Sequence, residues 1–204
     1  LLISIYMFKR DDRHVDNHEF VVVDIETTGL SCRTSKITEI GALKLRNSEI
    51  IDRFETLVNP EVRIPGFITR ITGIDNDMVK DAPRVNEVLP EFFNFLGDKC
   101  FIGHYATFDY NFLNHNAQLH HNYTMLNDKL CTCRLARRLL PVLPSKKLSS
   151  VSNHLGISET TEHRAMSDAL VTAKVFVNFL DRLKQKNISF VDELLKFQES
   201  KIPR

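Results

Sequence analysis

The feature that most constrains the fold is a short β-branched run that ends in two acids. Residues 20–24 are Phe-Val-Val-Val-Asp, and Glu26 follows two positions later. An unbroken apolar run of this length indicates a buried strand. Because side chains alternate along a strand, Asp24 and Glu26 point the same way. The chain is therefore expected to form a sheet that carries two neighbouring carboxylates at a strand end.

The remaining segments complete an α/β pattern. Three further strands are expected over 37–45, 50–58 and 99–103, with a polar hairpin turn over 46–49. Apolar spacing of i, i+3, i+4 predicts a helix over 85–96. Four more helices are expected over 108–118, 130–140, 164–183 and 190–197. This order predicts an α/β sandwich around a mixed sheet, as one domain over 19–186 with an N-terminal extension (1–18) and a C-terminal helical tail (187–204).

Composition limits the possible classes of protein. At 204 residues, with 43% apolar and 26% charged side chains, the chain can bury a core without disulfides. The net charge of +1 is weak evidence against nucleic-acid binding, because a local basic groove is enough to bind a nucleic acid. The four cysteines are irregularly spaced, which favours reduced thiols and a cytoplasmic location. No apolar run approaches the ~20 residues that cross a bilayer, so no membrane partner is expected.

Two same-facing acids at the end of a buried strand require a positive partner, and a divalent cation with oxygen ligands supplies one. Each candidate residue also has an ordinary alternative. Asp24 and Glu26 could be a plain strand end, Asp109 could cap a helix, and His163 could be a surface loop residue. His163 and Asp168 cannot share one helix face. They converge if His163 lies on the loop before the helix and Asp168 in its first turns.

Three segments together resemble the DEDDh exonuclease family, which includes the proofreading subunits of bacterial replicative polymerases. The segments are Asp24-Ile-Glu26-Thr-Thr-Gly29, His104-Tyr-Ala-Thr-Phe-Asp109 and His163-Arg-Ala-Met-Ser-Asp168. The resemblance covers roughly residues 20–183. It implies a ribonuclease-H-like α/β fold with a central mixed five-stranded sheet flanked by helices. It also implies 3′–5′ exonuclease activity on DNA that releases 5′-mononucleotides, in proofreading or repair.

The resemblance further implies two divalent cations, Mg²⁺ or Mn²⁺, held by four carboxylates. Asp24 would bridge both ions, Glu26 and Asp168 would hold the ion that carries the attacking water, and Asp109 would support the second. Two such ions stabilise the attacking and leaving oxygens of an in-line displacement. His163 would take a proton from the water, a role for which histidine is the side chain most often used.

Expected substrate contacts lie in two places. The turn Thr27-Thr28-Gly29-Leu30 would offer backbone N–H groups and an apolar wedge to the terminal nucleotide. His104 and Phe108 match family positions near the scissile bond, although Phe108 could equally be core. Six basic residues and no acidic one lie between 129 and 150, and they could follow a phosphate backbone or form a solvated face. The expected partners are single-stranded or frayed 3′ ends, with DNA favoured over RNA, and a DNA polymerase subunit.

Two alternatives stay open. Tyr105, Cys131 and Thr72 depart from the family pattern at positions outside the five catalytic ones, which keeps an RNA-directed 3′–5′ exonuclease possible. A non-catalytic polymerase-docking module would use Leu1–Phe8 or Val191–Phe197 as an apolar strip. The presence of all five catalytic residues argues against this second alternative.

Overall fold

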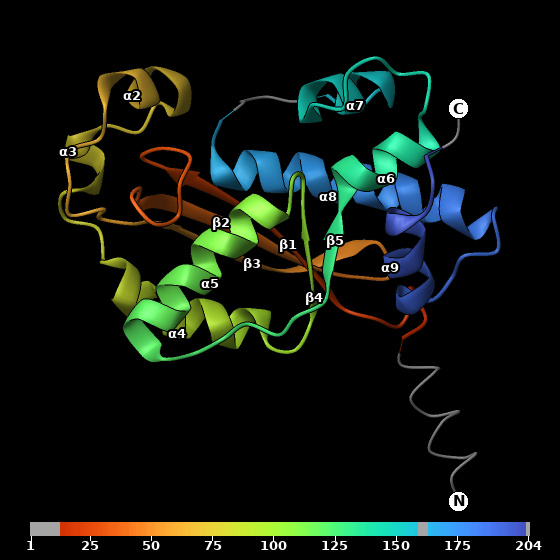
Figure 1. Cartoon of the computed structure of the whole chain (residues 1–204), viewed down its shortest axis with the longest axis horizontal. Helices are drawn as coiled ribbons and strands as arrows, with labels where there is room; N and C mark the ends of the chain where they lie inside the picture. Colours follow the sequence, from red (N-terminus) through yellow and green to blue (C-terminus); the bar gives the residue numbers. More distant parts are fainter. Residues whose placement is uncertain (1–12, 159–162, 203–204) are drawn as a thin grey trace, which may run out of the picture.

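A five-stranded mixed sheet forms the centre of the molecule (Figure 1). The computed structural model describes residues 13–158 and 163–202. The strands are β1 (Phe20–Thr27), β2 (Ile37–Arg46), β3 (Glu49–Leu57), β4 (Cys100–Gly103) and β5 (Lys129–Cys131), in the order β3-β2-β1-β4-β5. β1 pairs antiparallel with β2 and parallel with β4, and β4 pairs parallel with β5. The expected α/β fold with a mixed five-stranded sheet is confirmed.

Helices cover both faces of this sheet. One core cluster joins the sheet to α4 (Val85–Leu96) and α5 (Thr107–His121). The other joins it to α6 (Thr132–Leu139), α7 (Leu148–His154), α8 (Ala165–Lys184) and α9 (Val191–Glu199). In Figure 1 α8 runs along the upper side of the strands, and α4 lies on their lower side. Two short helices, α2 (Gly66–Thr72) and α3 (Asn76–Val79), follow β3.

Strand alternation decides which residues face α8. Phe20 and Val22 of β1 pack in the α8 cluster, whereas Val21 and Val23 pack in the α4–α5 cluster. The same alternation places Asp24 and Glu26 on the α8 face. In β2 the odd residues Leu43 and Leu45 pack on the α8 side. An irregularity of register between Glu26 and Thr27 ends this regular pairing near the end of β1.

The helix expected over 130–140 was wrong at its start. Lys129–Cys131 is the edge strand β5, and the helix α6 begins only at Thr132. A parallel strand of three residues carries too little alternation to identify from sequence. A distant residue covers its free edge, since Cys131 N–H donates to Gln198 Oε1 at 2.9 Å and Gln198 Nε2 donates to the Lys129 carbonyl at 2.7 Å. The helices α2, α3 and α7 were not predicted, because four to seven residues show too little periodicity.

The expected N-terminal extension and C-terminal tail pair with each other in the parts that the structure describes. His14 forms an antiparallel bridge with Phe190, and Val15 N–H donates to the Ser189 carbonyl at 2.9 Å. Val191 and Leu194, in the strip considered for docking, are buried and belong to the α8-side core. The other strip, Leu1–Phe8, lies outside the described residues. In the part of the chain that the structure describes, every helix is too short or too polar to cross a bilayer.

Candidate active site

Three carboxylates meet where β1 ends beneath the start of α8. Oxygens of Asp24, Glu26 and Asp168 all lie within 4.8 Å of one another, and all three residues are half-buried. Asp24 and Glu26 come from the α8 face of β1, and Asp168 lies in the first turn of α8. The structure thus brings Asp168 together with two acids that lie 144 and 142 positions before it in the sequence, and these are three of the four expected ligands.

Asp109 stands beside this cluster, in the first turn of α5, and is 3% exposed. The backbone N–H of Ile25, between Asp24 and Glu26, donates to Asp109 Oδ1 at 3.2 Å. Gly103 leaves room for this carboxylate. A Cβ atom at Gly103 would lie 3.3 Å from Asp109 Oδ2 and 2.9 Å from the Ala106 Cα atom. The close turn between β4 and α5 therefore aims Asp109 at the end of β1.

Burial and mutual repulsion make this cluster costly to ionise. Burial, then the charges of Asp109, Asp168 and Glu26, raise the pKa of Asp24 well above its ordinary range. Burial has the largest effect on Glu26, and together with the charges of Asp168 and Glu39 it raises the pKa of Glu26 to about 8. Burial also raises the pKa of Asp109 to about 8, against an opposing hydrogen bond from Ile25. Several hard oxygen ligands in one place fit a divalent cation, which would offset this repulsion.

His163 lies two residues before the first residue of α8, in the left-handed backbone region with φ of 60°. Its side chain is exposed, and its backbone N–H donates to Asp168 Oδ2 at 3.2 Å. The histidine is therefore outside the helix, as the sequence requires if it is to approach Asp168. The backbone of His163 is thus held beside Asp168, one of the three carboxylates.

The turn expected to bind the terminal nucleotide, Thr27–Leu30, belongs to a loop that is held by hydrogen bonds between its own residues. Thr28 N–H donates to the Lys36 carbonyl at 2.8 Å, and Lys36 N–H donates to Thr28 Oγ1 at 2.9 Å. Thr27 Oγ1 donates to the Gly29 carbonyl at 2.7 Å. Leu30, in contrast, is 89% exposed. The loop thus presents one large apolar side chain next to the strand that carries Asp24 and Glu26.

His104, expected near the scissile bond, is buried and both of its ring nitrogens have partners within the chain. It is 8% exposed, with Nδ1 2.8 Å from Thr132 Oγ1 and Nε2 2.7 Å from the Lys146 carbonyl. Burial lowers the pKa of His104 to about 4, so the ring is neutral and its Nε2–H donates to Lys146. In this arrangement His104 connects β4 to the loop before α7. Phe108 is half-buried beside Phe112, with ring centroids 4.9 Å apart.

Several residues of the basic tract contact other parts of the chain. Arg134 pairs with Glu199, and Arg138 donates to the Ser200 carbonyl, both at the end of α9. The Lys129 ammonium lies 4.2 Å from the centre of the Tyr110 ring. These three cations therefore have partners within the chain.

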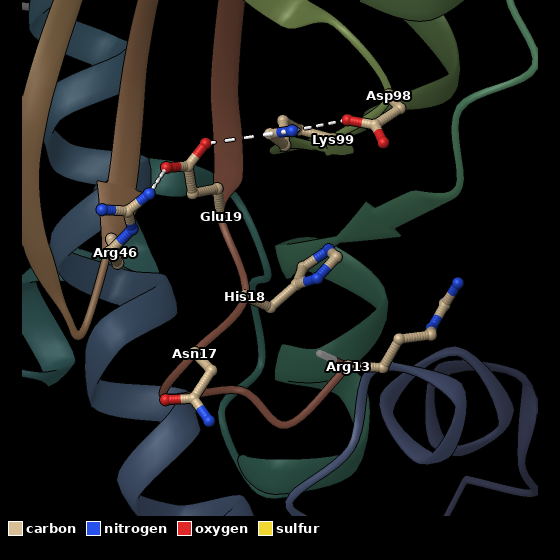
Figure 2. Close-up of a pocket in the computed structure, with 7 residues that line it drawn as sticks. All are labelled: Arg13, Asn17, His18, Glu19, Arg46, Asp98 and Lys99. Atoms are coloured by element: carbon tan, nitrogen blue, oxygen red, sulfur yellow. Dashed lines mark hydrogen bonds and ion pairs between the residues drawn. The ribbon is translucent and has the colours of Figure 1, made fainter. Parts of the chain in front are cut away.

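A hollow of about 590 Å³ lies far from the carboxylates, at the other end of β1 (Figure 2). It is formed where β1 begins, β2 ends and β4 begins, and its cations have acidic partners within the chain. Lys99 contacts Asp98 at 2.5 Å, and Arg46 pairs with Glu19. Paired charges of both signs do not match a phosphate-binding site, so the candidate active site is the carboxylate cluster.

Glu39 was not predicted as a site residue. It is 1% exposed in β2, opposite Glu26 in the strand register, and it binds Arg164 at the start of α8. The signal available in the sequence was a lone acid inside an apolar strand, because a buried carboxylate requires a partner.

Comparison with known proteins agrees with this geometry. The sequence model of the RNase_T exonuclease family matches residues 21–176. The chain belongs to this exonuclease family. The DNA polymerase III subunit epsilon of Aquifex aeolicus is 36% identical over 164 residues, which is 80% of this chain and 81% of that protein. The expected resemblance to proofreading subunits is confirmed.

A longer relative shares the sequence, and solved structures share the fold. A DNA polymerase III PolC-type protein of Caldanaerobacter subterraneus subsp. tengcongensis is 43% identical over 86% of this chain, but the chain spans only 12% of that protein. Exonuclease X, solved with 5′ overhanging duplex DNA, has a TM-score of 0.72 at 23% identity, covering 88% of this chain and 99% of that one. Escherichia coli exonuclease I, solved with a dT13 oligonucleotide, has a TM-score of 0.73 at 17% identity, covering 83% and 42%. These two structures share the fold.

Proposed function

We propose that this exonuclease removes 5′-mononucleotides from the 3′ end of DNA and requires two divalent cations, Mg²⁺ or Mn²⁺. The observation that carries the proposal is the convergence of three carboxylates within 4.8 Å, next to a histidine. The two relatives named as DNA polymerase III components support DNA as the substrate and replication as the setting. We propose a DNA polymerase as the partner.

Asp24, Glu26, Asp109 and Asp168 would hold the cations. When bound, such cations stabilise the attacking water and the leaving 3′ oxygen of an in-line displacement. The chain contributes the arrangement of the ligands. The β1 strand presents Asp24 and Glu26, α8 presents Asp168, and the Ile25 N–H orients Asp109.

His163 would be the general base. It would accept a proton from the water that attacks the terminal phosphodiester, while the bond from phosphorus to the 3′ oxygen of the preceding nucleotide breaks. The imidazole is suited to this role because it is exposed and its backbone is tied to Asp168. Leu30 and the Thr27–Gly29 turn would contact the terminal nucleotide, and His104 and Phe108 would lie near the scissile bond.

The test uses oligonucleotides labelled at either end, with Mg²⁺, Mn²⁺ or EDTA. A 5′-labelled single strand should give a ladder that shortens stepwise from the 3′ end, and EDTA should stop the reaction. A circular single strand should resist. Single-stranded ends should react faster than paired ends, because unpairing costs a few kcal/mol.

Each result has a defined meaning. Cleavage of the circle, or a ladder that shortens from the 5′ end, would contradict the proposed direction. Full activity in EDTA would contradict the metal requirement. Faster degradation of a matched RNA strand would leave the mechanism in place and assign the enzyme to RNA ends.

A further inference from the structure

Two residues of β2 lie directly opposite the two carboxylates of β1. Glu39 pairs with Glu26, and Gly41 pairs with Asp24 in the antiparallel register. By strand alternation Glu39 and Gly41 face the same side of the sheet, towards α8. Both contact the start of that helix, which carries Asp168.

Glu39 holds the start of α8 through several hydrogen bonds. Arg164 Nη2 donates to Glu39 Oε1 at 2.6 Å, and Arg164 Nε lies 3.1 Å from Oε1 and 3.2 Å from Oε2. The backbone N–H of Ala165, the first residue of α8, donates to Glu39 Oε2 at 2.9 Å. Such a forked ion pair fixes orientation as well as distance. Glu39 therefore acts as an acidic cap, supplied by β2, at the start of α8, and it binds Arg164, the residue that follows His163.

Gly41 allows the same helix to approach the sheet. A Cβ atom at this position would lie 2.4 Å from the Ala165 carbonyl carbon and 2.4 Å from the Met166 nitrogen. Both atoms are backbone, so no side-chain rotation could relieve the clash. Any larger residue at 41 would force the first turn of α8 away from β2, and Asp168 would move with it.

We propose that Glu39 and Gly41 are positioning residues that hold Asp168 and His163 against Asp24 and Glu26. This proposal rests on the proposed function. Glu39 also engages Arg164, a cation near enough to attract Glu26. With Glu39 in place, the guanidinium is bound to a carboxylate outside the ligand set. Partners that orient metal ligands typically change metal affinity or activity by about 10–100-fold when removed.

Glu39→Gln and Gly41→Ala test this role. Glu39→Gln keeps the shape but removes the charge that binds Arg164. We expect the Mg²⁺ concentration for half-maximal thermal stabilisation, measured without DNA, to rise about 10-fold in each variant. We also expect kcat to fall about 10–100-fold while KM for DNA changes by less than about 3-fold. Hydrogen exchange of the amides at 165–168 in metal-free protein should become faster.

Two matched controls separate positioning from general stability. Glu19→Gln removes the acid of an ion pair that joins the region of β1 to β2 at the other end of the sheet. Gly66→Ala adds a methyl group whose nearest neighbour, at 3.9 Å, is the flexible end of Arg70. Neither should change the Mg²⁺ dependence or kcat, even if Glu19→Gln lowers the melting temperature.

The outcomes are distinct. Wild-type Mg²⁺ dependence, kcat and amide exchange in folded Glu39→Gln and Gly41→Ala would overturn the proposal and make both residues merely structural. If Glu39→Gln does not fold, Arg164→Lys takes its place, and an unchanged Mg²⁺ dependence and amide exchange there would overturn it. An inactive wild-type protein would contradict the proposed function, whereas amide exchange at 165–168 would still decide the positioning role.

Discussion

The backbone N–H of His163 donates to Asp168 Oδ2 across 3.2 Å, although the two residues are five positions apart. Within one helix, five residues turn the side chains by about 140° beyond a full turn, which would separate them. The left-handed backbone of His163, with φ of 60°, takes it out of the helix and back over its first turn. A proposed base and a proposed metal ligand are therefore fixed to each other by main-chain geometry.

Replacing His163 should separate its chemical role from its backbone role. Both His163→Asn and His163→Ala should lower kcat by ~10²–10⁴, because neither side chain can act as the base. Asn tolerates the left-handed region, whereas Ala there costs roughly 1–2 kcal/mol. The melting temperature should therefore fall in the Ala variant more than in the Asn variant. Metal binding should persist in both, and its loss in His163→Asn would make His163 a ligand instead.

Replacing Asp24 should abolish activity and stabilise the metal-free fold. Asp24→Asn removes the carboxyl group whose pKa is raised by burial and by four neighbouring acids. We expect activity below a few per cent, because the central ligand is lost. In EDTA near pH 8 the melting temperature should rise by about 2–4 °C for each kcal/mol of repulsion relieved. Normal activity, or a lower melting temperature in EDTA, would show that Asp24 is a structural acid.

The metal-free protein should lose stability as pH rises. Glu26 and Asp109 have folded-state pKa values of about 8, above their ordinary values of 4.5 and 3.8. The folded state therefore binds more protons than the unfolded state between these limits. Their contribution is fully present below about pH 4 and is lost progressively as pH rises to about 8. Thermal melts in EDTA from pH 5 to pH 9 measure this loss.

Added Mg²⁺ should act in the opposite direction. Carboxylates must lose their protons to bind the ion, so the stabilisation by Mg²⁺ should grow with pH over the same range. Glu26→Gln should flatten the pH dependence in EDTA, since it removes one of the two groups. A wild-type profile in EDTA that rises with pH would show that these carboxylates are ionised without metal.

The sequence identified the parts of the fold that have strong local signals. The β-branched run of β1 and the apolar stripe of α4 are long enough to show their periods, and both elements are present. The edge strand β5 was mistaken for the start of a helix because its identity depends on pairing with β4. Its outer edge is covered by Gln198, and no local pattern reveals that contact.

The residues of the candidate site also divide into those with a local sequence signal and those that depend on contacts between distant segments. Asp24, Glu26 and Asp168 were identified by motif, and the structure brings them together. Glu39 and Gly41 were missed as site residues, because their importance comes from the register between β1 and β2 and from the closeness of α8. His104 was expected as a substrate contact, but whether its ring nitrogens are available depends on Thr132 and Lys146, 28 and 42 residues away.

Leu30 should contribute to binding of the DNA end without contributing to the fold. Its side chain is 89% exposed on the loop that follows Asp24 and Glu26, so its removal costs little folded-state packing. If it packs against the terminal base, Leu30→Ala should lose about 1–2 kcal/mol of binding, or roughly 5–30-fold in KM for single-stranded DNA. The melting temperature should stay within about 1 °C of wild type, since exposed sites away from special features change stability little.

Val142 is a matched control for Leu30, because it is also apolar and 89% exposed. It lies in the segment between α6 and α7. Val142→Ala should leave both KM and the melting temperature unchanged. Equal increases of KM in the two variants would mean that exposed apolar surface in general, and not a wedge at Leu30, draws DNA to the protein. An unchanged KM in Leu30→Ala would remove Leu30 from the substrate site.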